Sequence, residues 1–513
     1  MHALMMATGE KVKPLAELAE IVTRLKAAGK KIVHTHGVFD LLHIGHIRHF
    51  EQARSMGDVL IVTLTQDVHV NKGPHRPAFP QDLRAEILAA LSVVDYVAVN
   101  QWPLSVETIR LLKPDVYVKG PDYRVAEQDI TGGIVLEGDA VRAVGGELRF
   151  TDDITFSSST LVNRFLSPFE PEVNEFLEGF RRKYSIDYVL DWLDRASTLK
   201  PIVVGEAIID EYIFCDALGK SSKDPLLAVL MESETSQAGG SLSIANHLAG
   251  LCGEVGLITM LGDRERREDF VTQSLKPNVN QTLITKVGAP TIHKRRMVDR
   301  YSGNKLFEIY VMDDRLAAGE DAAALEATLR KQLDAWDVAI VADYGHGMMT
   351  PAAVDILCTQ APFLAVNVQS NAGNRGFNPV SKYRRADYVS LAVHEINMET
   401  RDRVRNLREQ LLEVAGRVSC DRFTVTRGKL GSLHYNPPDT WVEVPALATR
   451  VLDRVGAGDA VLAVTSLLVK LGAPWDVVGF IGNVAGAELV AELGNRVPLN
   501  KIALAKHITA LMK

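Results

Sequence analysis

The chain has 513 residues, which is more than one ordinary domain needs and enough for two or three. Hydrophobic residues make up 47% and charged residues 24%, so disordered, collagen-like and disulfide-scaffold proteins are excluded. The net charge of -7, with no block of like charge, excludes a nucleic-acid-binding surface. Any anionic ligand must therefore be bound by local features of the chain, such as helix N-termini and glycine-rich turns.

The four cysteines are too widely spaced for a zinc site and too few for a secreted disulfide scaffold. Gly, Glu and Lys interrupt the N-terminus before a signal-peptide core could form. The longest apolar runs reach only about ten residues, too few to span a membrane. We therefore expect a cytoplasmic protein with no targeting segment and no membrane partner.

The pattern of short apolar runs divides the chain into three parts. Residues 1–165 alternate β-branched runs with amphipathic stretches, as in KIVHTHG, HIGHIRHFEQARSMG and DVLIVTLT, which is typical of βαβ units around a parallel sheet. Residues 166–198 are polar with helical spacing and predict a helical linker. A second βα series from PIVVGEAIID onward predicts one large α/β domain over residues 199–513.

The first candidate site follows the first predicted strand, where His43, Gly45 and His46 open a helix. Unpaired N–H groups at a helix N-terminus favour a bound phosphate. Two histidines three positions apart share one face of the first turn, and both can donate to α-phosphate oxygens as charge develops. Gly45 leaves room for a nucleotide, and Gly37 lets the preceding backbone approach it. The pattern predicts nucleotidyl transfer; the alternative is two helix-start histidines in ordinary surface contacts.

The stretches GVFDLLHIGHIRHFEQARSMGD, VKGPDY and FSSSTLVNRF resemble the cytidylyltransferase-like nucleotidyltransferase family, over nearly all of residues 30–165. The resemblance implies a Rossmann-like fold in which His43 and His46 stabilise the transition state. It also implies that the turn His36–Asp40 packs against the nucleotide and that a Ser/Thr turn holds phosphate. The nucleotide-binding residues expected in this half are His36, Gly37, Phe39, Asp40, Gly45, Lys72, Arg76, Lys119, Gly120, Asp122, Ser158, Ser159 and Thr160.

Some of these residues have a second interpretation. Lys72 and Arg76 are placed to meet triphosphate charge, or else belong to a solvated basic loop. Lys119 and Asp122 follow a strand end, where open α/β sheets bind ligands, but Asp122 could equally cap a turn. We expect Mg²⁺ because it accompanies nucleoside triphosphates, although the sequence shows no clear set of metal-binding residues.

The second candidate site is the sequence Gly456-Ala457-Gly458-Asp459 before an apolar helix. Its glycines let successive N–H groups converge into an anion hole, and Asp459 can take the proton from a substrate hydroxyl that attacks a γ-phosphate. The alternative is a glycine-rich turn with Asp459 as the helix N-cap.

The stretch DRVGAGDAVLAV resembles the second signature of the ribokinase-like (PfkB) carbohydrate kinases. VVGEAIIDEY, QAGGSLSIANHLAGL, VADYGHG, TVTRGKLGS and GNVAGAELVAELGN fall in that family's order over roughly residues 200–500. The resemblance implies that Asp459 is the catalytic base and Gly456–Gly458 the anion hole. It places Arg427, Gly428, Gly431 and Asn483 near ATP, and it assigns the sugar to Asp210, Gly239, Gly240, Ser243 and Asp453.

The chain departs from the kinase family's pattern at several positions. Ser243 replaces the Asn of a GGxxN stretch, and an NxxE pattern keeps only Glu395, a candidate metal-binding residue. Asn367-Val368-Gln369 stands where Asp-Pro-Lys is frequent, and Arg454 stands where a small hydroxyl residue is frequent. The loop Ser370–Pro379 either lines the kinase pocket or is a structured surface loop.

The two halves together resemble the bifunctional enzymes of ADP-heptose synthesis, which join a heptose-phosphate kinase to an adenylyltransferase. In that family the kinase comes first, so we expect an exchanged domain order here. The resemblance implies two reactions: ATP-dependent phosphorylation of a sugar or sugar phosphate, and its coupling to a nucleotide, with pyrophosphate release, to give an ADP-heptose-like sugar for surface polysaccharide (lipopolysaccharide) synthesis.

Two alternatives remain open from the sequence. One is a CTP-dependent cytidylyltransferase for another sugar or polyol phosphate, with a kinase half of altered substrate. The other is a non-catalytic, scaffolding kinase-like half. Ribokinase-like kinases are often dimers, so we expect a homo-oligomer whose partners are otherwise a sugar phosphate and a nucleoside triphosphate, not a nucleic acid.

Overall fold

The computed structural model describes residues 10–70, 76–124, 133–152, 168–438 and 440–513. It divides into two compact units, Met1–Pro168 with Ala505–Lys513 (unit 1) and Phe169–Leu504 (unit 2). Each unit combines helices with a sheet, so the predicted α/β class is confirmed.

The predicted linker contains two helices that group with unit 2. The sequence predicts a linker over residues 166–198, whereas helices α8 (Pro171–Lys183) and α9 (Ile186–Ala196) belong to unit 2. Phe180 of α8 is buried and stacks on Phe480 of α17, with ring centroids 4.3 Å apart. The amphipathic spacing read as a linker therefore reflects an apolar face that packs onto unit 2.

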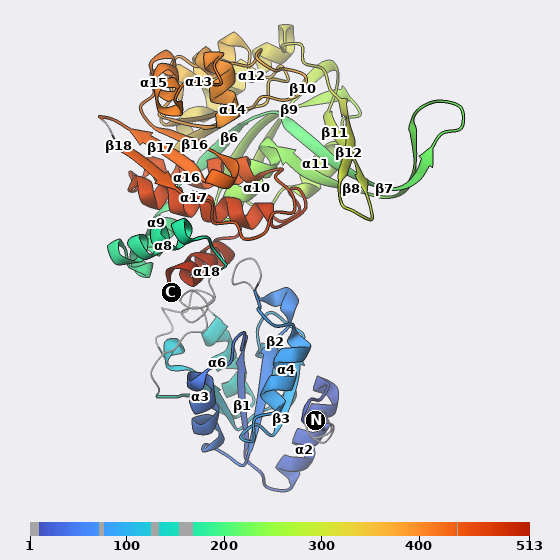
Figure 1. The fold of residues 1–513 in the computed structure, drawn as a ribbon, viewed down its shortest axis with the longest axis vertical. Coiled ribbons are helices and arrows are strands. Elements are labelled where there is room, and N and C mark those ends of the chain that lie inside the picture. Colours follow the sequence, from blue (N-terminus) through green and yellow to red (C-terminus); the bar gives the residue numbers. More distant parts are fainter. Residues whose placement is uncertain (1–9, 71–75, 125–132, 153–167, 439) are drawn as a thin grey trace. The chain divides into compact units, whose positions relative to one another are not determined.

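Unit 1 is built on a five-stranded sheet in the order β3-β2-β1-β4-β5, and each neighbouring pair is parallel (Figure 1). Strand β2 is buried along its whole length, as expected for a parallel sheet covered on both faces. The strands are β1 (Ile32–Gly37), β2 (Val59–Thr65), β3 (Tyr96–Asn100), β4 (Val116–Lys119) and β5 (Glu147–Phe150), and the helices are α2 (Leu15–Ala27), α3 (Ile44–Arg54), α4 (Gln81–Ala89), α5 (Val106–Leu112) and α6 (Gly133–Ala143).

The order of unit 1 reverses between β1 and β4, which pair directly in the middle of the sheet. In open α/β sheets, ligands bind outside the carboxyl ends of the strands at such a reversal. β1 ends at Gly37, just before α3, and β4 ends at Lys119. The topology therefore places the first candidate motif beside Lys119.

Unit 2 contains a nine-stranded sheet in the order β10-β9-β6-β13-β14-β15-β16-β17-β18. The run from β10 to β16 is parallel, and β17 and β18 add antiparallel strands at one edge. The strands are β6 (Pro201–Gly205), β9 (Val255–Arg264), β10 (Val279–Pro290), β13 (Val338–Asp343), β14 (Leu364–Val368), β15 (Tyr388–Ala392), β16 (Phe423–Thr426), β17 (Ser432–Asn436) and β18 (Thr440–Val444).

Helices cover the large sheet of unit 2. The helices are α10 (Ser241–Ala249), α11 (Glu268–Ser274), α12 (Gly319–Gln332), α13 (Pro351–Gln360), α14 (Val393–Thr400), α15 (Leu407–Val418), α16 (Ala457–Lys470) and α17 (Trp475–Val490), and α18 (Lys501–Met512) ends the chain. Helix α16 lies between the sheet and α17 and is buried from Asp459 to Val469. A helix buried on all sides is apolar all round, which explains its sequence. Its first turn carries Asp459.

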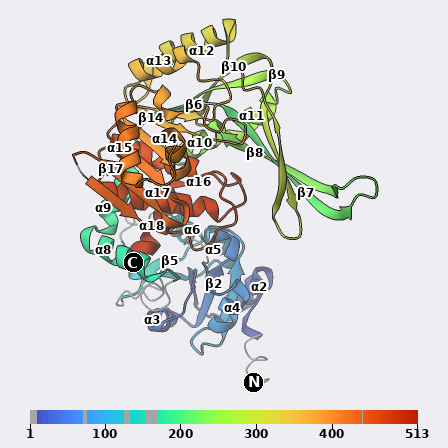
Figure 2. The same cartoon turned by 45° about the horizontal axis from the view of Figure 1, so that its top comes forward.

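A second, four-stranded sheet in the order β12-β11-β7-β8 completes unit 2. Its strands are β7 (Ala207–Lys220), β8 (Leu227–Gly240), β11 (Ile292–Asp299) and β12 (Lys305–Val311). β7 follows β6 almost directly, so the small sheet rises from the carboxyl edge of the large one. Figure 2 shows the far end of the β7–β8 hairpin projecting from unit 2. We call the four strands the lid sheet.

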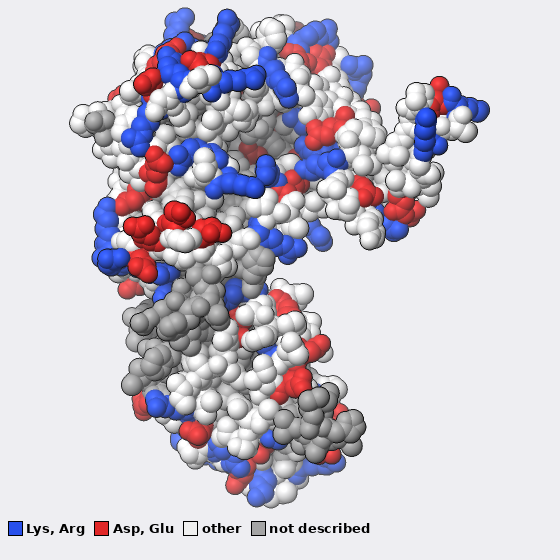
Figure 3. All heavy atoms as spheres, viewed as in Figure 1, with Lys and Arg blue, Asp and Glu red and all other residues white. Residues whose placement is uncertain are grey.

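No helix among the described residues is both long and apolar enough to cross a membrane. The four cysteines are free thiols. Basic and acidic side chains are interspersed on the visible surface of unit 2 (Figure 3), in keeping with phosphate binding by local features rather than by one charged face.

Candidate active sites

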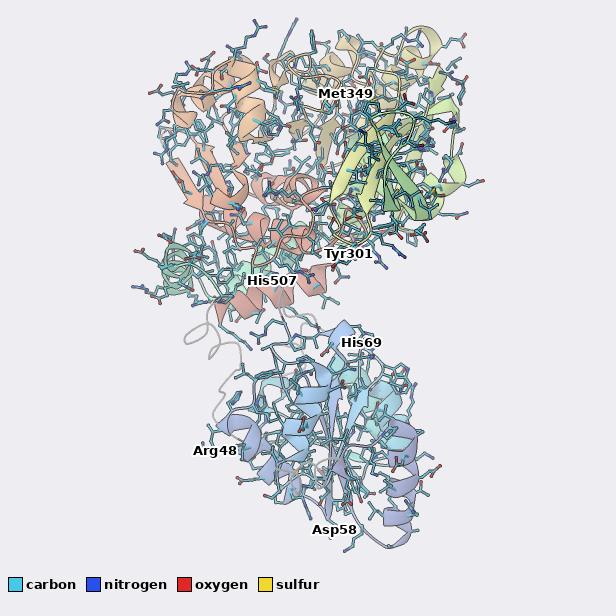
Figure 4. All side chains as sticks on the ribbon, turned by 45° about the vertical axis from the view of Figure 1, so that its right-hand side comes forward. Arg48, Asp58, His69, Tyr301, Met349 and His507 are labelled. Atoms are coloured by element: carbon cyan, nitrogen blue, oxygen red, sulfur yellow. The ribbon has the colours of Figure 1, made fainter. Side chains whose placement is uncertain are left out.

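The first candidate motif lies at the N-terminus of α3, as the sequence predicts. His43 is the N-cap, and its Nδ1 accepts from the N–H of Gly45 at 3.2 Å. The rings of His43 and His46 lie side by side, with centroids 3.9 Å apart. Both side chains are half-buried, and Figure 4 shows Arg48 further along the same helix. The two imidazoles therefore stand together at the positive end of a helix dipole.

The turn between β1 and α3 is held by Phe39. Its backbone has a φ of 48°, and its buried ring packs edge-on against His46 and Phe50, at 5.4 and 5.2 Å between centroids. A Cβ on Gly37 would lie 2.9 Å from this ring. Gly37 is thus required by the packing of Phe39, which in turn orients His46.

Asp40 and Arg76, both predicted to bind nucleotide, are bonded to each other. The buried Asp40 carboxylate accepts from Nε of Arg76 and from the N–H of Ala78. Beside them, Arg84 is buried and donates to the carbonyl of Thr65 at 2.9 Å. These bonds fasten the turn after β1 to the residues around α4, a positioning role that the sequence reading did not include.

Lys119 is buried at the end of β4 and forms an ion pair with Glu137 of α6, with 2.8 Å between Nζ and Oε2. Glu137 also accepts from the hydroxyl of Ser105 at 2.8 Å. Burial opposes ionisation of Glu137, but Lys119 outweighs it and lowers the pKa of Glu137 to about 2. The sequence analysis missed Glu137; its signal is a carboxylate inside the otherwise apolar stretch GIVLEG.

Two buried histidines of β1 lie beneath the same site. Nδ1 of His36 lies 3.0 Å from the hydroxyl of Thr63, and Nε2 of His34 lies 2.7 Å from that hydroxyl. Burial lowers the pKa of His36 to about 4 and that of His34 to about 3, so both rings are neutral near pH 7. His36 was predicted; His34 was not, although alternating positions of a strand share a face.

Several predicted residues of unit 1 cannot be placed against this geometry. Lys72, Ser158, Ser159 and Thr160 lie outside the described residues, as does the side chain of Asp122. Gly120 follows β4 and is the N-cap of a short 3-10 turn, Pro121–Tyr123.

In unit 2, the Gly-Ala-Gly-Asp motif forms the start of α16. Gly456 is the N-cap with a φ of 82°, and Ala457 and Gly458 lie in the first turn. A Cβ on Gly456 would lie 1.7 Å from Oδ1 of Asn495. Only glycine satisfies both the backbone conformation and this close approach. The first N–H groups of the helix lack intrahelical acceptors, a geometry that favours a bound anion.

Asp459 is buried, and its Oδ1 accepts from the hydroxyl of Tyr344 at 3.1 Å and from Nε2 of Gln369 at 2.9 Å. Burial raises the pKa of Asp459 to about 7, and the nearby charge of Asp210 acts in the same direction. A carboxylate whose pKa lies near the working pH is suited to general-base chemistry. Tyr344 and Gln369 come from the ends of neighbouring parallel strands and were not predicted.

Asp210 of β7 lies close to the glycine pair, as predicted. Its Oδ1 accepts from Nη1 of Arg296 at 2.5 Å, and its Oδ2 accepts from Nδ2 of Asn495 at 3.4 Å. A Cβ on Gly239 would lie 2.1 Å from Oδ2 of Asp210, so Gly239 makes room for this carboxylate. Gly240, with a φ of 58°, is the N-cap of α10.

Asp453 is the second buried carboxylate at this end of the site. It accepts from the hydroxyl of Tyr212 at 3.0 Å and from Nζ of Lys305 at 2.7 Å. Close by, Oε1 of Gln237 and Oδ1 of Asn495 are buried and have no hydrogen-bond donor among the residues that the structure describes. Unsatisfied buried acceptors are costly, and the hydroxyls of a polyol are the groups that would satisfy them.

Ser243 does not face this cluster. Its hydroxyl lies 3.1 Å from Nε2 of His247, one turn further along α10, and both residues are buried. Nδ1 of His247 in turn accepts from the N–H of Leu499. The structure therefore ties Ser243 to the packing of α10, and its contact with a sugar stays a prediction.

The predicted ATP-binding residues lie where β16 to β18 meet α17. Nη1 of Arg427 is 3.0 Å from a carboxylate oxygen of Glu443, and Nδ2 of Asn483 donates to the carbonyl of Val444 at 3.1 Å. Gly428 and Gly431 have φ angles of 60° and 79° in the turn after β16. Because β16 is parallel to β13 to β15, this turn lies at the same sheet edge as Asp459.

Glu395, the candidate metal-binding residue, accepts from two backbone groups. Its Oε2 accepts from the N–H of Ala392 at 2.7 Å and its Oε1 from that of Ser370 at 3.2 Å. Burial raises the pKa of Glu395 to about 7. No group of three or more His, Cys, Asp or Glu suited to a metal occurs in the part of the chain that is described.

The loop Ser370–Pro379 lines two cavities next to this edge of the sheet. Gly373, Asn374 and Phe377 line one of about 920 Å³, and Ser370 with Glu395 lines another of about 430 Å³. Figure 4 shows Met349, which also lines the larger cavity, just before α13.

Residues 199–502 match the pfkB family of carbohydrate kinases, and residues 34–164 match the cytidylyltransferase-like family. The first match covers more than half of the chain, so the chain belongs to the pfkB family of carbohydrate kinases. Phosphofructokinase-2 from Escherichia coli, solved with substrates and products, has a TM-score of 0.51 and 15% identity, covering 62% of this chain and 100% of its own. The same enzyme with potassium gives a TM-score of 0.50. These structures establish the ribokinase-like fold of unit 2.

The N-terminal part is similar to curated proteins named bifunctional protein HldE. That of Syntrophotalea carbinolica is 37% identical over 163 residues, 31% of this chain and 32% of the relative. The one from Geobacter metallireducens is 39% identical over 165 residues, 32% of each chain, and the one from Aliarcobacter butzleri 46% over 130 residues, 24% of this chain and 27% of the relative. The chain thus spans about a third of the length of the curated relatives it matches.

Within this chain the cytidylyltransferase-like segment precedes the kinase segment. The expectation that this order is exchanged relative to the enzymes of ADP-heptose synthesis is not confirmed, because the matches to the HldE proteins cover only about a third of them.

Proposed function

We propose that this chain is a bifunctional enzyme, with an ATP-dependent carbohydrate kinase in unit 2 and a pyrophosphate-releasing nucleotidyltransferase in unit 1. The observation that carries the proposal is Asp459, a buried carboxylate with a pKa near 7 at a helix N-terminus, beside carboxylates and free acceptors suited to a polyol. Membership of the pfkB family supports the kinase half.

In the kinase reaction, a hydroxyl of the acceptor donates its proton to Asp459 and attacks the γ-phosphorus of ATP. The acceptor's other hydroxyls are held by Asp210, Gln237 and Asn495. The first N–H groups of α16 stabilise the charge on the transferred group. ATP occupies the sheet edge toward Arg427 and Asn483. The position of Asp459 in the first turn of α16, bonded to Tyr344 and Gln369 from two neighbouring strand ends, supports a catalytic rather than a purely scaffolding unit 2.

In the nucleotidyl transfer, the phosphate of a phosphorylated sugar attacks the α-phosphorus of a nucleoside triphosphate, and pyrophosphate leaves. His43, His46 and the start of α3 stabilise the developing charge, and Lys119 adds a positive charge held by Glu137. Mg²⁺ binds chiefly through phosphate oxygens and water in such reactions, so it needs no cage of protein carboxylates.

We propose ATP as the nucleotide of unit 1 and an ADP-heptose-like product for lipopolysaccharide synthesis, on the similarity to the HldE proteins. CTP with another sugar or polyol phosphate is the second candidate, supported by the match to the cytidylyltransferase-like family. We also propose a cytoplasmic location, because both proposed reactions consume nucleoside triphosphates, which the cytoplasm supplies, and because the four cysteines are free thiols. We also propose a homo-oligomer, by analogy with related kinases.

The test is to incubate the full-length protein with ATP or CTP, each with free heptose, heptose phosphates and other polyol phosphates, and to identify the products by mass. Formation of a phosphorylated sugar and of a nucleotide-linked sugar is expected. Absence of the first product for every acceptor would refute the kinase half, and absence of the second would refute the transferase half.

A further inference from the structure

Lys294 of β11 is a buried cation without a counter-ion. It is 7% exposed, yet its ammonium makes no hydrogen bond or ion pair with any residue that the structure describes. Its nearest partners are aromatic rings, Tyr310 with a centroid at 5.4 Å and Tyr344 at 5.9 Å. Burial lowers the pKa of Lys294, as expected where no carboxylate contacts it. A buried charge that stays unpaired is costly, and an anionic ligand that pairs with it would remove this cost.

The position of Lys294 links the two ends of the kinase site. In the lid sheet Lys294 is paired in register with Asp210 of β7, so both side chains lie on one face. The hydroxyl of Tyr344, whose ring lies under the ammonium, donates to Asp459. Figure 4 marks Tyr301 in the turn at the opposite end of β11, away from this contact.

The other cations of this face already have carboxylate partners. Arg296 pairs with Asp210 at 2.5 Å, and Lys305 pairs with Asp453 at 2.7 Å. Lys294 therefore differs from its neighbours in having its charge available to a ligand. Asp210 and Asp453 are already paired with cations, so an anion that approaches Lys294 meets an ammonium that neither of them contacts.

We propose that Lys294 is a catalytic residue of the kinase, with its ammonium bound to an anionic phosphate oxygen beside Asp459. The inference rests on the kinase function proposed above. In the transfer, the acceptor oxygen forms a bond to the γ-phosphorus, the bond to the β–γ bridging oxygen breaks, ADP leaves, and Asp459 receives the hydroxyl proton. Lys294 forms no covalent bond; it neutralises charge on the γ-phosphoryl group or on a phosphate that the acceptor already carries.

The test compares full-length Lys294→Met, which keeps length without charge, with Lys294→Arg, which keeps the charge. Lys220→Met, at an exposed position of the lid sheet, is the matched control. With ATP and heptose 7-phosphate, Lys294→Met should lose about 10²–10³-fold in kcat/KM, with partial recovery in Lys294→Arg and no change in the control. Unchanged kcat and KM in Lys294→Met would overturn the proposal.

The acceptor distinguishes the two sources of the phosphate oxygen. A loss of kcat with both free heptose and heptose 7-phosphate assigns Lys294 to the γ-phosphoryl group. A rise in KM with heptose 7-phosphate alone assigns it to the acceptor's own phosphate. In either case the acid limb of the rate profile should move to higher pH in Lys294→Met, because the charge of Lys294 lowers the pKa of Asp459. A merely structural lysine would not produce a loss that depends on the acceptor's phosphate or on vanadate.

A binding measurement separates failure of this proposal from failure of the kinase function. If the wild-type chain phosphorylates neither acceptor, the kinase function fails, and Lys294 is tested by calorimetry with ADP, Mg²⁺ and orthovanadate, which mimics the transferred group. A vanadate-dependent gain in ADP affinity that is lost in Lys294→Met and kept in Lys220→Met supports the proposal. An equal gain in all three proteins, or none in the wild type, overturns it.

Discussion

Both candidate sites lie at the N-terminus of a helix, but the side chains there differ: imidazoles in unit 1 and a carboxylate in unit 2. In unit 1, the N-terminus of α3 carries two half-buried imidazoles above neutral histidines and a buried Lys119–Glu137 pair. In unit 2, the N-terminus of α16 carries a buried carboxylate with a pKa near 7. Attack by a phosphate, already ionised, needs charge stabilisation only, whereas attack by a hydroxyl also needs a base. In the two reactions proposed here, the side chains at the helix N-terminus, and not the helix end itself, therefore select the reaction.

Asp459→Asn is the substitution with the largest expected effect, and it tests whether the two reactions take place at separate sites. Removing the base should lower sugar phosphorylation by about 10²–10⁴-fold, because the acceptor hydroxyl has no other proton acceptor at that position. Nucleotidyl transfer should be unchanged. ADP release and pyrophosphate release, measured separately on the full-length protein, check both halves; loss of both activities would contradict two independent sites.

His43→Ala is the reciprocal change. Loss of one of the two imidazoles should lower nucleotidyl transfer by about 10²–10³-fold, since its contact with the α-phosphate forms in the transition state. Sugar phosphorylation should stay at the wild-type rate. Pyrophosphate release is the measurement, and a normal rate in His43→Ala would mean that the histidine pair is only a helix cap.

Gly239→Ala tests the sugar end of unit 2. The new Cβ would lie 2.1 Å from Asp210, so the carboxylate must move, at a cost of about 1–3 kcal/mol. We expect a higher KM for the sugar acceptor and a lower thermal midpoint. Gly253→Ala, where a Cβ would meet no atom within 4 Å, is the control. Equal KM values in the two variants would contradict a contact between Asp210 and the sugar acceptor.

The smallest expected effect is a pH dependence that distinguishes the two reactions. Because burial raises the pKa of Asp459 to about 7, its carboxylate is protonated below that pH and cannot act as a base. Sugar phosphorylation should fall about tenfold per pH unit below 7, as the ionised fraction does. Parallel rate profiles check this; a kinase rate that is flat between pH 5 and 7 would argue against Asp459 as the base.

Much of this description could be predicted from local sequence. The βα alternation indicated two α/β regions, and the histidine and glycine motifs indicated two helix N-termini after strands, because a helix start and its glycines depend on neighbouring residues. The helical spacing of residues 166–198 predicted helices but not what they pack against, since a polar amphipathic stretch gives no sign of what its apolar face contacts. Ser243 is assigned to the sugar by its place in a motif, which could not show that its hydroxyl also lies 3.1 Å from Nε2 of His247 on the same helix; the sugar contact stays a prediction.

The sequence alone thus determined which residues could carry the chemistry, namely His43, His46 and Asp459 at the starts of two helices. Only the tertiary structure decided their electrostatic state. It buried Asp459 against Tyr344 and Gln369, paired Lys119 with Glu137, and left Lys294 without a carboxylate. The physical reason is that pKa values and ion pairing depend on burial and on distances of a few ångströms between residues far apart in the chain, which no local pattern records.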